Sequence, residues 1–311
     1  MPTFDTPAPI SVSIEIGAGS TEIIASDRTD TVVEVRPANS ANKNDVAAAE
    51  QTQVNYSDGN LTVKSPRNWR KYVVWNEGGS VDIKIGLPSG SRLRGEAGVG
   101  ELRVIGPSRA AQVRVDGLLG ECTFKVGAGD IQLSQAGPLQ LRTGAGDITV
   151  ERAVGHSEIT TGSGSVQVSR ADGSAVIKNS NGDIWVGEAR ADLRVTTANG
   201  KIRVSVAHSD VDAKTANGSV QIDEVMGGTV RAHTAAGKVE VGVRRGVAAL
   251  LDLETSWGKV LNGLDESDPP QPGHPSVEVR ARTSFGDIRV FRASGPDVAD
   301  IPATTGTTDN A

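Results

Sequence analysis

Large aromatic rings and sulfur are scarce in this sequence. Aromatic residues make up only 3% of the 311 residues, which excludes a thick core built on phenylalanine and tryptophan. The single cysteine, Cys122, excludes an intrachain disulfide. Because Cys122 lies in the alternating run ECTFKV, where a small apolar residue would serve equally well, we expect a buried and unreactive thiol.

An excess of positive charge is also missing. The formal net charge is -6, and lysine and arginine are scattered among the acids without a basic stripe, so we expect no nucleic-acid partner. The opening residues MPTFDTPAPISVSIEI have neither the basic nor the apolar region of a secretory signal. No stretch approaches the roughly 18 apolar residues that cross a bilayer. We therefore expect a cytoplasmic protein with no membrane span.

What the sequence has in abundance is glycine, with 37 residues arranged in an internal repeat. The stretches TANGKIRV (197–204) and TANGSVQI (215–222) show the repeating unit most clearly, and their glycines are 18 residues apart. Chance does not produce the four consecutive intervals of 18 that lead to this pair. The glycines that mark successive units are Gly129, Gly146, Gly164, Gly182, Gly200, Gly218, Gly237, Gly258 and Gly286.

Each unit contains two short runs in which apolar and polar residues alternate, such as DLRVTTA followed by GKIRVSVA. This alternation predicts two half-buried strands per unit. In an antiparallel meander, residues one unit apart lie two strands away, whereas in a solenoid they are neighbours in a parallel ladder and benefit from being alike. The repeat therefore predicts an all-β fold, a single parallel β-solenoid (β-helix) of roughly ten or eleven two-strand coils of about 18 residues.

Outward-facing charges support stacking in the order of the sequence. At one outward position of the repeat, successive units carry basic and acidic residues in turn, so that stacked coils would place opposite charges side by side. Alternatively, these residues lie on a solvated face and their charges alternate by chance. The residues are Arg194, Asp212, Arg231, Asp252 and Arg280.

The pattern divides the chain into three parts. Residues 1–80 predict N-terminal strands and a short helix over 40–51, which together form the cap that a solenoid needs at its open end. Residues 81–292 hold the solenoid repeats, with a proline-rich insertion at 262–276 that loops outward between two coils. Residues 293–311 predict a disordered tail.

The glycine turns themselves predict structure rather than chemistry. A phosphate cradle needs a following helix, but each turn leads into a strand. A calcium β-roll needs a regular aspartate ligand, and lysine follows the glycine in several units. We expect corners in which glycine, Asn199 and Asn217 adopt positive φ. Threonines before the turns should face inward and bond corner amides, namely Thr143, Thr161, Thr197, Thr215, Thr234, Thr255 and Thr283.

No group of residues stands out as a metal or catalytic site. His156, His208, His233 and His274 share no ladder column, and no cysteine or acid lies near them at metal-ligand spacing. The outward carboxylates follow the repeat and form no separate cluster. We expect no cofactor, no metal and no catalytic residue.

Departures from the repeat supply the candidate binding residues. Segment 68–79 combines aromatic and basic side chains, and predicts either a cover for the solenoid end or a partner-binding patch. Two indoles elsewhere, one facing outward in a strand and one at a corner, could bind a sugar or a partner or could cover a neighbouring coil. The candidates are Trp69, Arg70, Tyr72, Trp75, Trp185 and Trp257.

The unit T-x-N-G-[DKS]-[IV]-x-V, together with VDIKIGLPSGSRLRGEAG (81–98), resembles a bacterial adhesin-like family of β-strand-repeat proteins, a domain of unknown function. The resemblance covers roughly residues 10–292 and is nearest to cytoplasmic-looking actinobacterial members. It implies a β-helical fold and supplies neither a substrate nor a catalytic residue. The chain departs from exported members in showing no signal or anchor.

The function that we expect is that of a non-catalytic, adhesin-like interaction scaffold that binds an unidentified protein or polysaccharide. The first alternative is self-association, because coils stacked end to end would build a filament. The second is a polysaccharide lyase or hydrolase, which would need several catalytic groups in one cleft.

Overall fold

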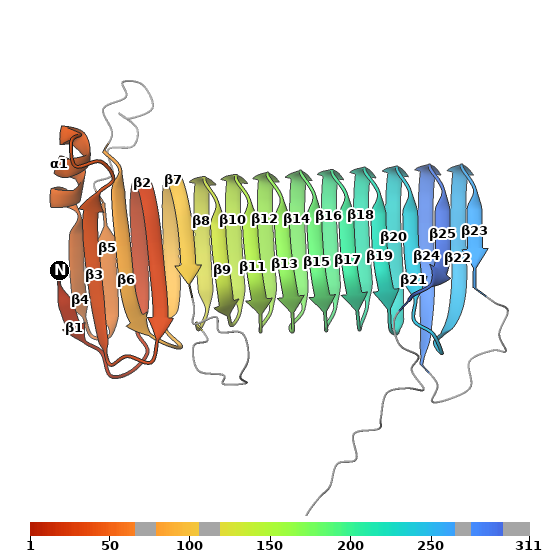
Figure 1. The fold of residues 1–311 in the computed structure, drawn as a ribbon, viewed down its shortest axis with the longest axis horizontal. Helices are drawn as coiled ribbons and strands as arrows, with labels where there is room; N and C mark the ends of the chain where they lie inside the picture. Colours follow the sequence, from red (N-terminus) through yellow and green to blue (C-terminus); the bar gives the residue numbers. More distant parts are fainter. Residues whose placement is uncertain (66–78, 106–118, 265–274, 295–311) are drawn as a thin grey trace, which may run out of the picture.

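The chain folds into a straight rod of stacked β-coils (Figure 1). The computed structural model describes residues 1–65, 79–105, 119–264 and 275–294. In the middle of the rod each coil has two strands, which lie in two facing β-walls with a narrow core between them. The predicted all-β solenoid is confirmed.

The two walls are named here by their position relative to the corner glycines. Neighbouring strands within a wall pair in parallel, with Thr197 beside Thr215 and Ile202 beside Val220, so 18 residues correspond to one coil. The first wall, before the glycines, holds β8 (Cys122–Ala128), β10 (Leu139–Ala145), β12 (Ser157–Ser163), β14 (Ala175–Asn181), β16 (Leu193–Asn199), β18 (Val211–Asn217) and β20 (Gly228–Ala236). The second wall, after them, holds β9 (Ile131–Ala136), β11 (Ile148–Ala153), β13 (Val166–Ala171), β15 (Ile184–Ala189), β17 (Ile202–Ala207), β19 (Val220–Val225) and β21 (Val239–Val243).

The core is a thin layer of aliphatic side chains. Inward positions such as Ile202, Val204 and Val220 are completely buried. Facing walls lie about 10 Å apart, a space that such side chains fill without large rings. Cys122 is also completely buried. The predicted burial of the thiol is thus confirmed, and burial raises its pKa to about 12, with the charge of Glu121 adding to this shift.

Each corner is a close approach between neighbouring coils. Gly200 has a φ of 147°, and a Cβ added there would lie 2.1 Å from the carbonyl oxygen of Gly182. Only glycine satisfies both conditions. The inward threonines are confirmed, but the expected bond to a corner amide is wrong: the Thr215 hydroxyl donates to the Gly200 carbonyl at 3.2 Å. The Gly200 amide is already bonded to the carbonyl of Asn217.

The corner asparagines have a different role from the predicted one. Among the described residues, Asp58 is the non-glycine residue with positive φ, so the prediction for Asn199 and Asn217 is wrong. Both asparagines end first-wall strands, and the adjacent glycine takes the turn. Their amides form a ladder: Asn199 Nδ2 donates to Asn181 Oδ1 at 2.8 Å, and Asn217 Nδ2 donates to Asn199 Oδ1 at 2.9 Å.

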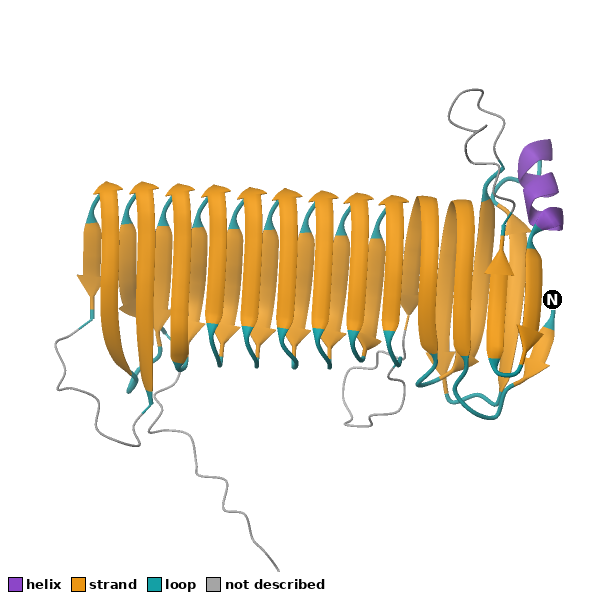
Figure 2. Ribbon diagram, turned by 180° about the vertical axis from the view of Figure 1, so that it is seen from behind, coloured by secondary structure: helices purple, strands orange, loops and turns teal. Residues whose placement is uncertain are grey.

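The N-terminal end of the rod is covered by antiparallel strands and a helix (Figure 2). Two long parallel strands, each running through both walls, connect this end to the regular coils, and shorter strands continue outward from them. The long strands are β2 (Ser11–Ser26) and β7 (Arg92–Ile105), followed outward by β5 (Asn60–Lys64) and β6 (Val81–Pro88), and then by the antiparallel β4 (Gln53–Ser57), β3 (Asp30–Pro37) and β1 (Thr3–Asp5).

The helix, α1 (Lys43–Gln51), packs against β3 and β6. Its N-cap is Asn42, whose side chain accepts from the Asn44 amide. The buried carboxylate of Asp45 accepts from the backbone amides of Asn39 at 3.0 Å and Ser80 at 2.9 Å. These bonds hold the helix to the end of the rod, and the predicted short helix is present.

The last two coils stack in the reverse of their sequence order. The chain first forms β22 (Ala248–Trp257) and β23 (Val260–Gly263), and then β24 (Ser276–Phe285) and β25 (Ile288–Arg292). Yet β24 and β25 lie between β20 and β21 on one side and β22 and β23 on the other. Residues 248–263, here called the terminal coil, therefore end the rod (Figure 1). The prediction that every coil stacks on its predecessor is wrong here.

The inward residues of the terminal coil explain this order. Leu253 stands in the column that Ala281 occupies in the coil beneath, and Asn262 stands in the column of Val290. Inside the rod, Asn262 would place an amide in the apolar core, and burying an unpaired amide is unfavourable. At the open end the same amide stays exposed, and its Oδ1 accepts from the Leu264 amide at 3.0 Å.

The connection that crosses to the terminal coil is held by an arginine. Arg292, at the end of β25, donates through Nη1 to the carbonyl oxygens of Arg244 at 3.1 Å and Val247 at 2.8 Å. Val247 is buried. Residues 265–274 of the predicted insertion and 295–311 of the predicted tail lie outside the described residues.

The reversed order also changes the predicted charge ladder. Arg194 Nε lies 3.5 Å from Asp212 Oδ2, and Arg231 follows Asp212, as expected. The next neighbour, however, is Arg280, so the alternation is wrong beyond Arg231. Arg280 instead pairs within its own strand, where its Nη2 lies 2.6 Å from a carboxylate oxygen of Glu278.

Candidate functional site

The predicted binding residues do not form one site. Trp185 is half-buried on the outer face of the second wall, where a Cβ added to Gly187 would lie 3.1 Å from the Trp185 ring. Trp257 is 72% exposed at the end of β22. Several coils separate the two indoles, so the structure does not bring them together. The remaining candidates, Trp69, Arg70, Tyr72 and Trp75, lie outside the described residues.

The terminal coil carries an apolar surface of which only Trp257 was a candidate from the sequence. Apart from Met1, every large apolar side chain that is exposed among the described residues lies on this coil or on the strand beneath it. These side chains are Leu250 (67% exposed), Trp257 (72%), Val260 (45%), Leu261 (49%) and Phe285 (60%). The exposure is therefore concentrated at one end of the rod.

The same end leaves core positions and backbone edges open. Val260 is 45% exposed, whereas its neighbour Ile288 in the coil beneath is completely buried. Leu253 is half-buried, whereas Ala281 beneath it is completely buried. Among the described residues, no strand pairs with the far edge of β22 or β23. Unpaired strand edges of this kind are templates for pairing with another chain.

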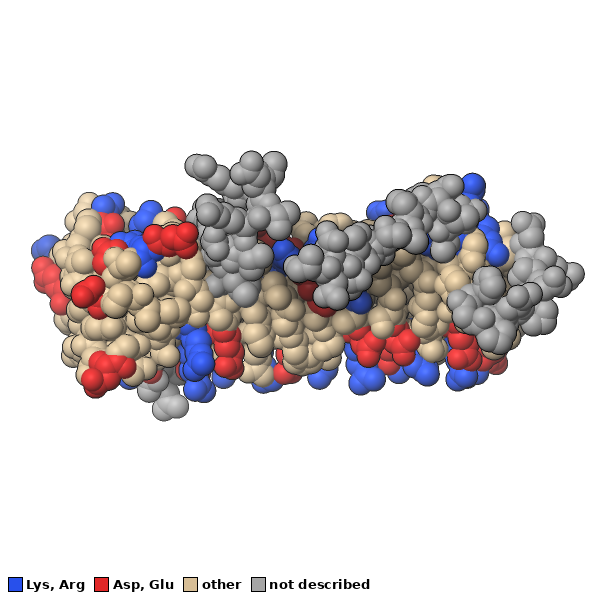
Figure 3. Space-filling view, turned by 90° about the horizontal axis from the view of Figure 1, so that it is seen from below, with Lys and Arg blue, Asp and Glu red and all other residues tan. Residues whose placement is uncertain are grey.

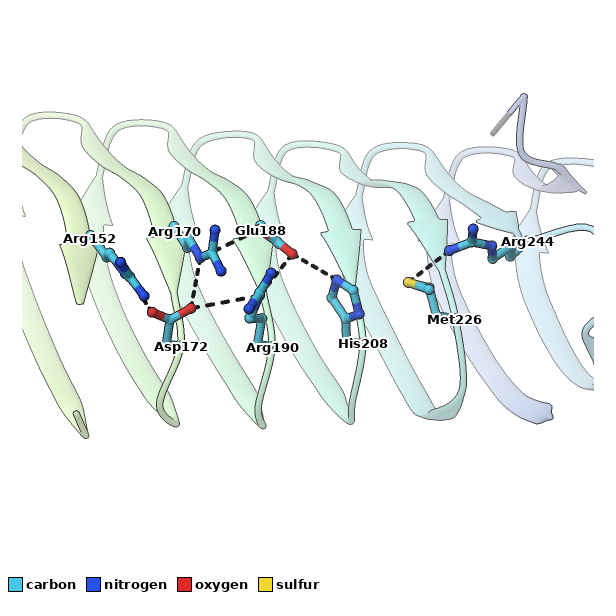
Figure 4. Close-up of polar contacts among 8 residues, drawn as sticks. All are labelled: Arg152, Arg170, Asp172, Glu188, Arg190, His208, Met226 and Arg244. Carbon is cyan, nitrogen blue, oxygen red and sulfur yellow. Dashed lines mark hydrogen bonds and ion pairs between the residues drawn. The ribbon is translucent and has the colours of Figure 1, made fainter. Parts of the chain in front are cut away.

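A second feature is a row of ion pairs along the turn opposite the glycine corners (Figure 4). Asp172 lies at its centre: its Oδ2 is 2.6 Å from Arg152 Nε, and its Oδ1 is 2.7 Å from Arg170 Nε. In the next coil, Glu188 Oε1 lies 3.0 Å from Arg190 Nε and 3.0 Å from His208 Nε2. We call this row the ionic ladder. Its members are Arg152, Arg170, Asp172, Glu188, Arg190 and His208.

The ionic ladder keeps its carboxylates charged. Partial burial acts to raise the pKa of Asp172, but the hydrogen bonds from Arg170 and Arg152 outweigh it and lower the pKa below its ordinary value. Burial likewise acts to raise the pKa of Glu188, but the bond from Arg190 together with the charges of Arg170, Arg190 and His208 outweighs it, so this pKa is lowered too. These directions are those of structural ion pairs rather than of a carboxylic acid poised to donate a proton.

Other polar groups are engaged between coils in the same way. His156 Nδ1 lies 2.8 Å from the hydroxyl oxygen of Ser174, and Asp183 Oδ1 accepts from the Lys201 amide at 2.7 Å. In the part of the chain that the structure describes, no three His, Cys, Asp or Glu side chains are grouped as a metal site would require. Within the same part, no helix has the length and apolarity needed to cross a membrane.

Surface charge of both signs is interspersed along the rod. Figure 3 shows acidic and basic side chains alternating along the face seen from below. On the outer faces of the two walls, opposite charges are paired between neighbouring coils, including Arg203 with Asp223 at 2.9 Å on the second wall and Arg142 with Glu158 at 3.2 Å on the first.

Comparison with known families gives one match that covers most of the chain. The model of the family described as Toastrack DUF4097 matches residues 11–291. No curated protein matches the sequence.

The comparison with solved structures gives matches from several bacteria. A candidate adhesin from Bacteroides fragilis is 13% identical, with 93% of this chain and 95% of that chain covered and a TM-score of 0.40. A candidate lipid-binding protein from Parabacteroides distasonis is 10% identical, with 92% and 95% covered and a TM-score of 0.34. A candidate cell-adhesion protein from Clostridium sporogenes is 13% identical, with 94% and 98% covered and a TM-score of 0.17.

Proposed function

This chain belongs to the Toastrack DUF4097 family, and from that premise and its own geometry we propose that it is a non-catalytic β-solenoid scaffold that binds another macromolecule through the terminal coil. The rod holds the binding surface rigidly at one end. The N-terminal strands and α1 cover the other end.

The observation that carries this proposal is the contrast between the terminal coil and the rest of the described chain. Along the rod, backbone groups pair with neighbouring coils, and inward aliphatic side chains are buried. At the terminal coil, two strand edges and the side chains of Leu250, Val260 and Leu261 are left open. Exposed apolar patches next to unpaired edges are typical of interaction sites.

Site-specific photo-crosslinking tests the proposal. A photoreactive amino acid replaces Leu261 on the terminal coil in one variant and Gln167, on the outer face of the second wall in the middle of the rod, in a control variant. Irradiation of the cells that make the protein should give covalent adducts with Leu261 and not with Gln167. Equal adduct formation at both positions, or none at either, would contradict the proposal.

The enzymatic alternative stays a prediction of the sequence. A polysaccharide lyase or hydrolase would need catalytic groups that titrate in a common cleft. Incubation of the purified chain with a panel of polysaccharides, followed by analysis of chain length, tests this alternative directly.

A further inference from the structure

We propose that the macromolecule bound by the terminal coil is a second copy of this chain, and that the two rods join end to end around a two-fold axis. This inference rests on the proposed function of the terminal coil and names its partner. The two copies would form a discrete dimer with the covered N-terminal ends at its outer tips.

The direction of the two edge strands argues for a second copy. β22 lies in the first wall and β23 returns along the second wall, so the terminal coil presents two open edges that run in opposite directions. A single bound peptide strand would satisfy one edge. A two-fold copy presents an antiparallel strand to both edges at once, because the same patch meets itself in such an interface.

The N-terminal end limits the assembly to two copies. A filament would require the terminal coil of one rod to continue into the first coil of the next. There, however, β3 and β4 already pair in antiparallel fashion with β6 and β5, and α1 packs beside them. An incoming parallel coil would have to displace these elements. Among the described residues, the outermost N-terminal strands, β1 and β4, each pair with one antiparallel neighbour, and they do not form a two-strand parallel coil like the terminal coil.

A two-fold axis allows two arrangements, with β22 of each copy beside either the β22 or the β23 of the other. Asp252 Oδ2 lies 3.7 Å from Arg282 Nη2, and Glu254 Oε2 lies 3.5 Å from Arg282 Nε. Because these acids are already paired with a cation of the coil beneath, their charges oppose neither arrangement.

The size of the end face sets the expected strength. At about 3.3 Å per residue, the ten residues of β22 span about 33 Å and the four residues of β23 about 13 Å, so an end face about 10 Å wide offers at most about 330 Å² per copy, below the roughly 800 Å² of a standard interface. Backbone hydrogen bonds and the flanking apolar side chains add to this contact. We therefore expect a dissociation constant on the order of 10 μM rather than a permanent dimer.

Sedimentation equilibrium of the full-length chain, from about 1 to about 300 μM, tests the proposal. The wild type should pass from the 32.2 kDa monomer to twice that mass. Val260→Lys places a charge on the interface side of the terminal coil and should keep the chain monomeric. Val176→Lys, the same change on an outward position in the middle of the rod, should dimerise like the wild type. Circular dichroism checks that both variants are folded.

Three results would overturn the proposal. One is a wild type that stays monomeric over the whole range. Another is a mass that keeps growing with concentration, as a filament would require. The last is a monomer whose β22 and β23 amides are nevertheless protected from hydrogen exchange, which would mean that another segment of the same chain covers the end. If Leu261 still forms adducts with other macromolecules in these cases, the terminal coil binds a partner that is not a second copy. If Leu261 forms no adducts, the proposed function is contradicted as well.

Discussion

At the residue scale, each corner combines a backbone conformation and a contact that a side chain would disrupt. Replacing Gly200 with alanine should destabilise the fold, because its φ of 147° disfavours a Cβ and the Gly182 carbonyl oxygen lies 2.1 Å from the Cβ position. We expect the free energy of unfolding to fall by roughly 3 kcal/mol. Gly17→Ala is the control, since a Cβ there has no neighbouring atom within 4 Å. Urea unfolding of both variants measures the difference, and equal midpoints would refute this account of the corner.

The ionic ladder predicts a pH-dependent contribution to stability. The pKa of Asp172 is lowered in the folded chain because bonds from Arg170 and Arg152 outweigh burial. The contribution of Asp172 to the free energy of unfolding is therefore complete above the unfolded-state pKa of about 3.9. This contribution is lost as the pH falls through the lower folded-state pKa. Asp172→Asn should lower the free energy of unfolding by about 1 kcal/mol near pH 7.

The test compares urea unfolding of the wild type and Asp172→Asn at about pH 7 and about pH 3. The difference between the two proteins should shrink at the lower pH, since Asp172 of the unfolded wild-type chain is then largely protonated while its folded-state pKa is lower, and this proton uptake favours unfolding. A difference that stays constant with pH would mean that the charge of Asp172 does not stabilise the fold.

The sequence predicted which residues form the corners, but it did not predict their hydrogen-bond partners. The alternation of apolar and polar residues placed Thr215 inward, but the partner of its hydroxyl depends on which backbone groups are already paired. Likewise, asparagine tolerates positive φ, yet the adjacent glycine takes that conformation and leaves Asn199 free to join an amide ladder. Such choices follow from neighbouring coils and not from the local sequence.

At the element scale, the order of the last coils is open to a direct chemical test. His233 and Arg282 are neighbours across β20 and β24, about 4.8 Å apart, whereas Glu254 lies one strand further, about 9.6 Å from His233. A disulfide needs Cα atoms about 4.4–6.8 Å apart. Oxidation should therefore close the pair His233→Cys with Arg282→Cys and leave the pair His233→Cys with Glu254→Cys reduced.

The native thiol does not interfere with this experiment. Burial raises the pKa of Cys122 to about 12, so it stays protonated and unreactive under mild oxidation. Non-reducing electrophoresis reports the result. If the Glu254 pair closes and the Arg282 pair does not, the coils stack in sequence order and the terminal coil is misassigned.

The regular elements were predictable because each coil repeats the last. The interval of 18 residues required a parallel ladder, and the structure shows it from β8 to β21. The reversal at the end was not predicted, because the apolar pattern of residues 248–263 is compatible with an internal coil. Its signals were Asn262 at an inward position and Leu253 in a column of alanines. Both are better suited to an open end than to the closed core.

At the scale of the whole molecule, a stack of coils has its unsatisfied groups at its ends. Of the binding residues expected from sequence, Trp257 lies on the terminal coil, where it is well exposed. Leu250, Val260 and Leu261 were not singled out from the sequence, because their exposure depends on where their coil lies and not on their local pattern. The surface on which the proposed function depends could therefore be recognised only in the folded chain.

Small-angle X-ray scattering tests most directly whether the interaction surface lies at the end of the rod. Roughly a dozen coils at about 4.8 Å each give a rod about 60 Å long. As concentration rises, end-to-end pairing predicts that the rod length approaches about 120 Å with an unchanged cross-section, and that Val260→Lys stays near 60 Å. A dimer that thickens without lengthening would place the contact on the walls and contradict the account.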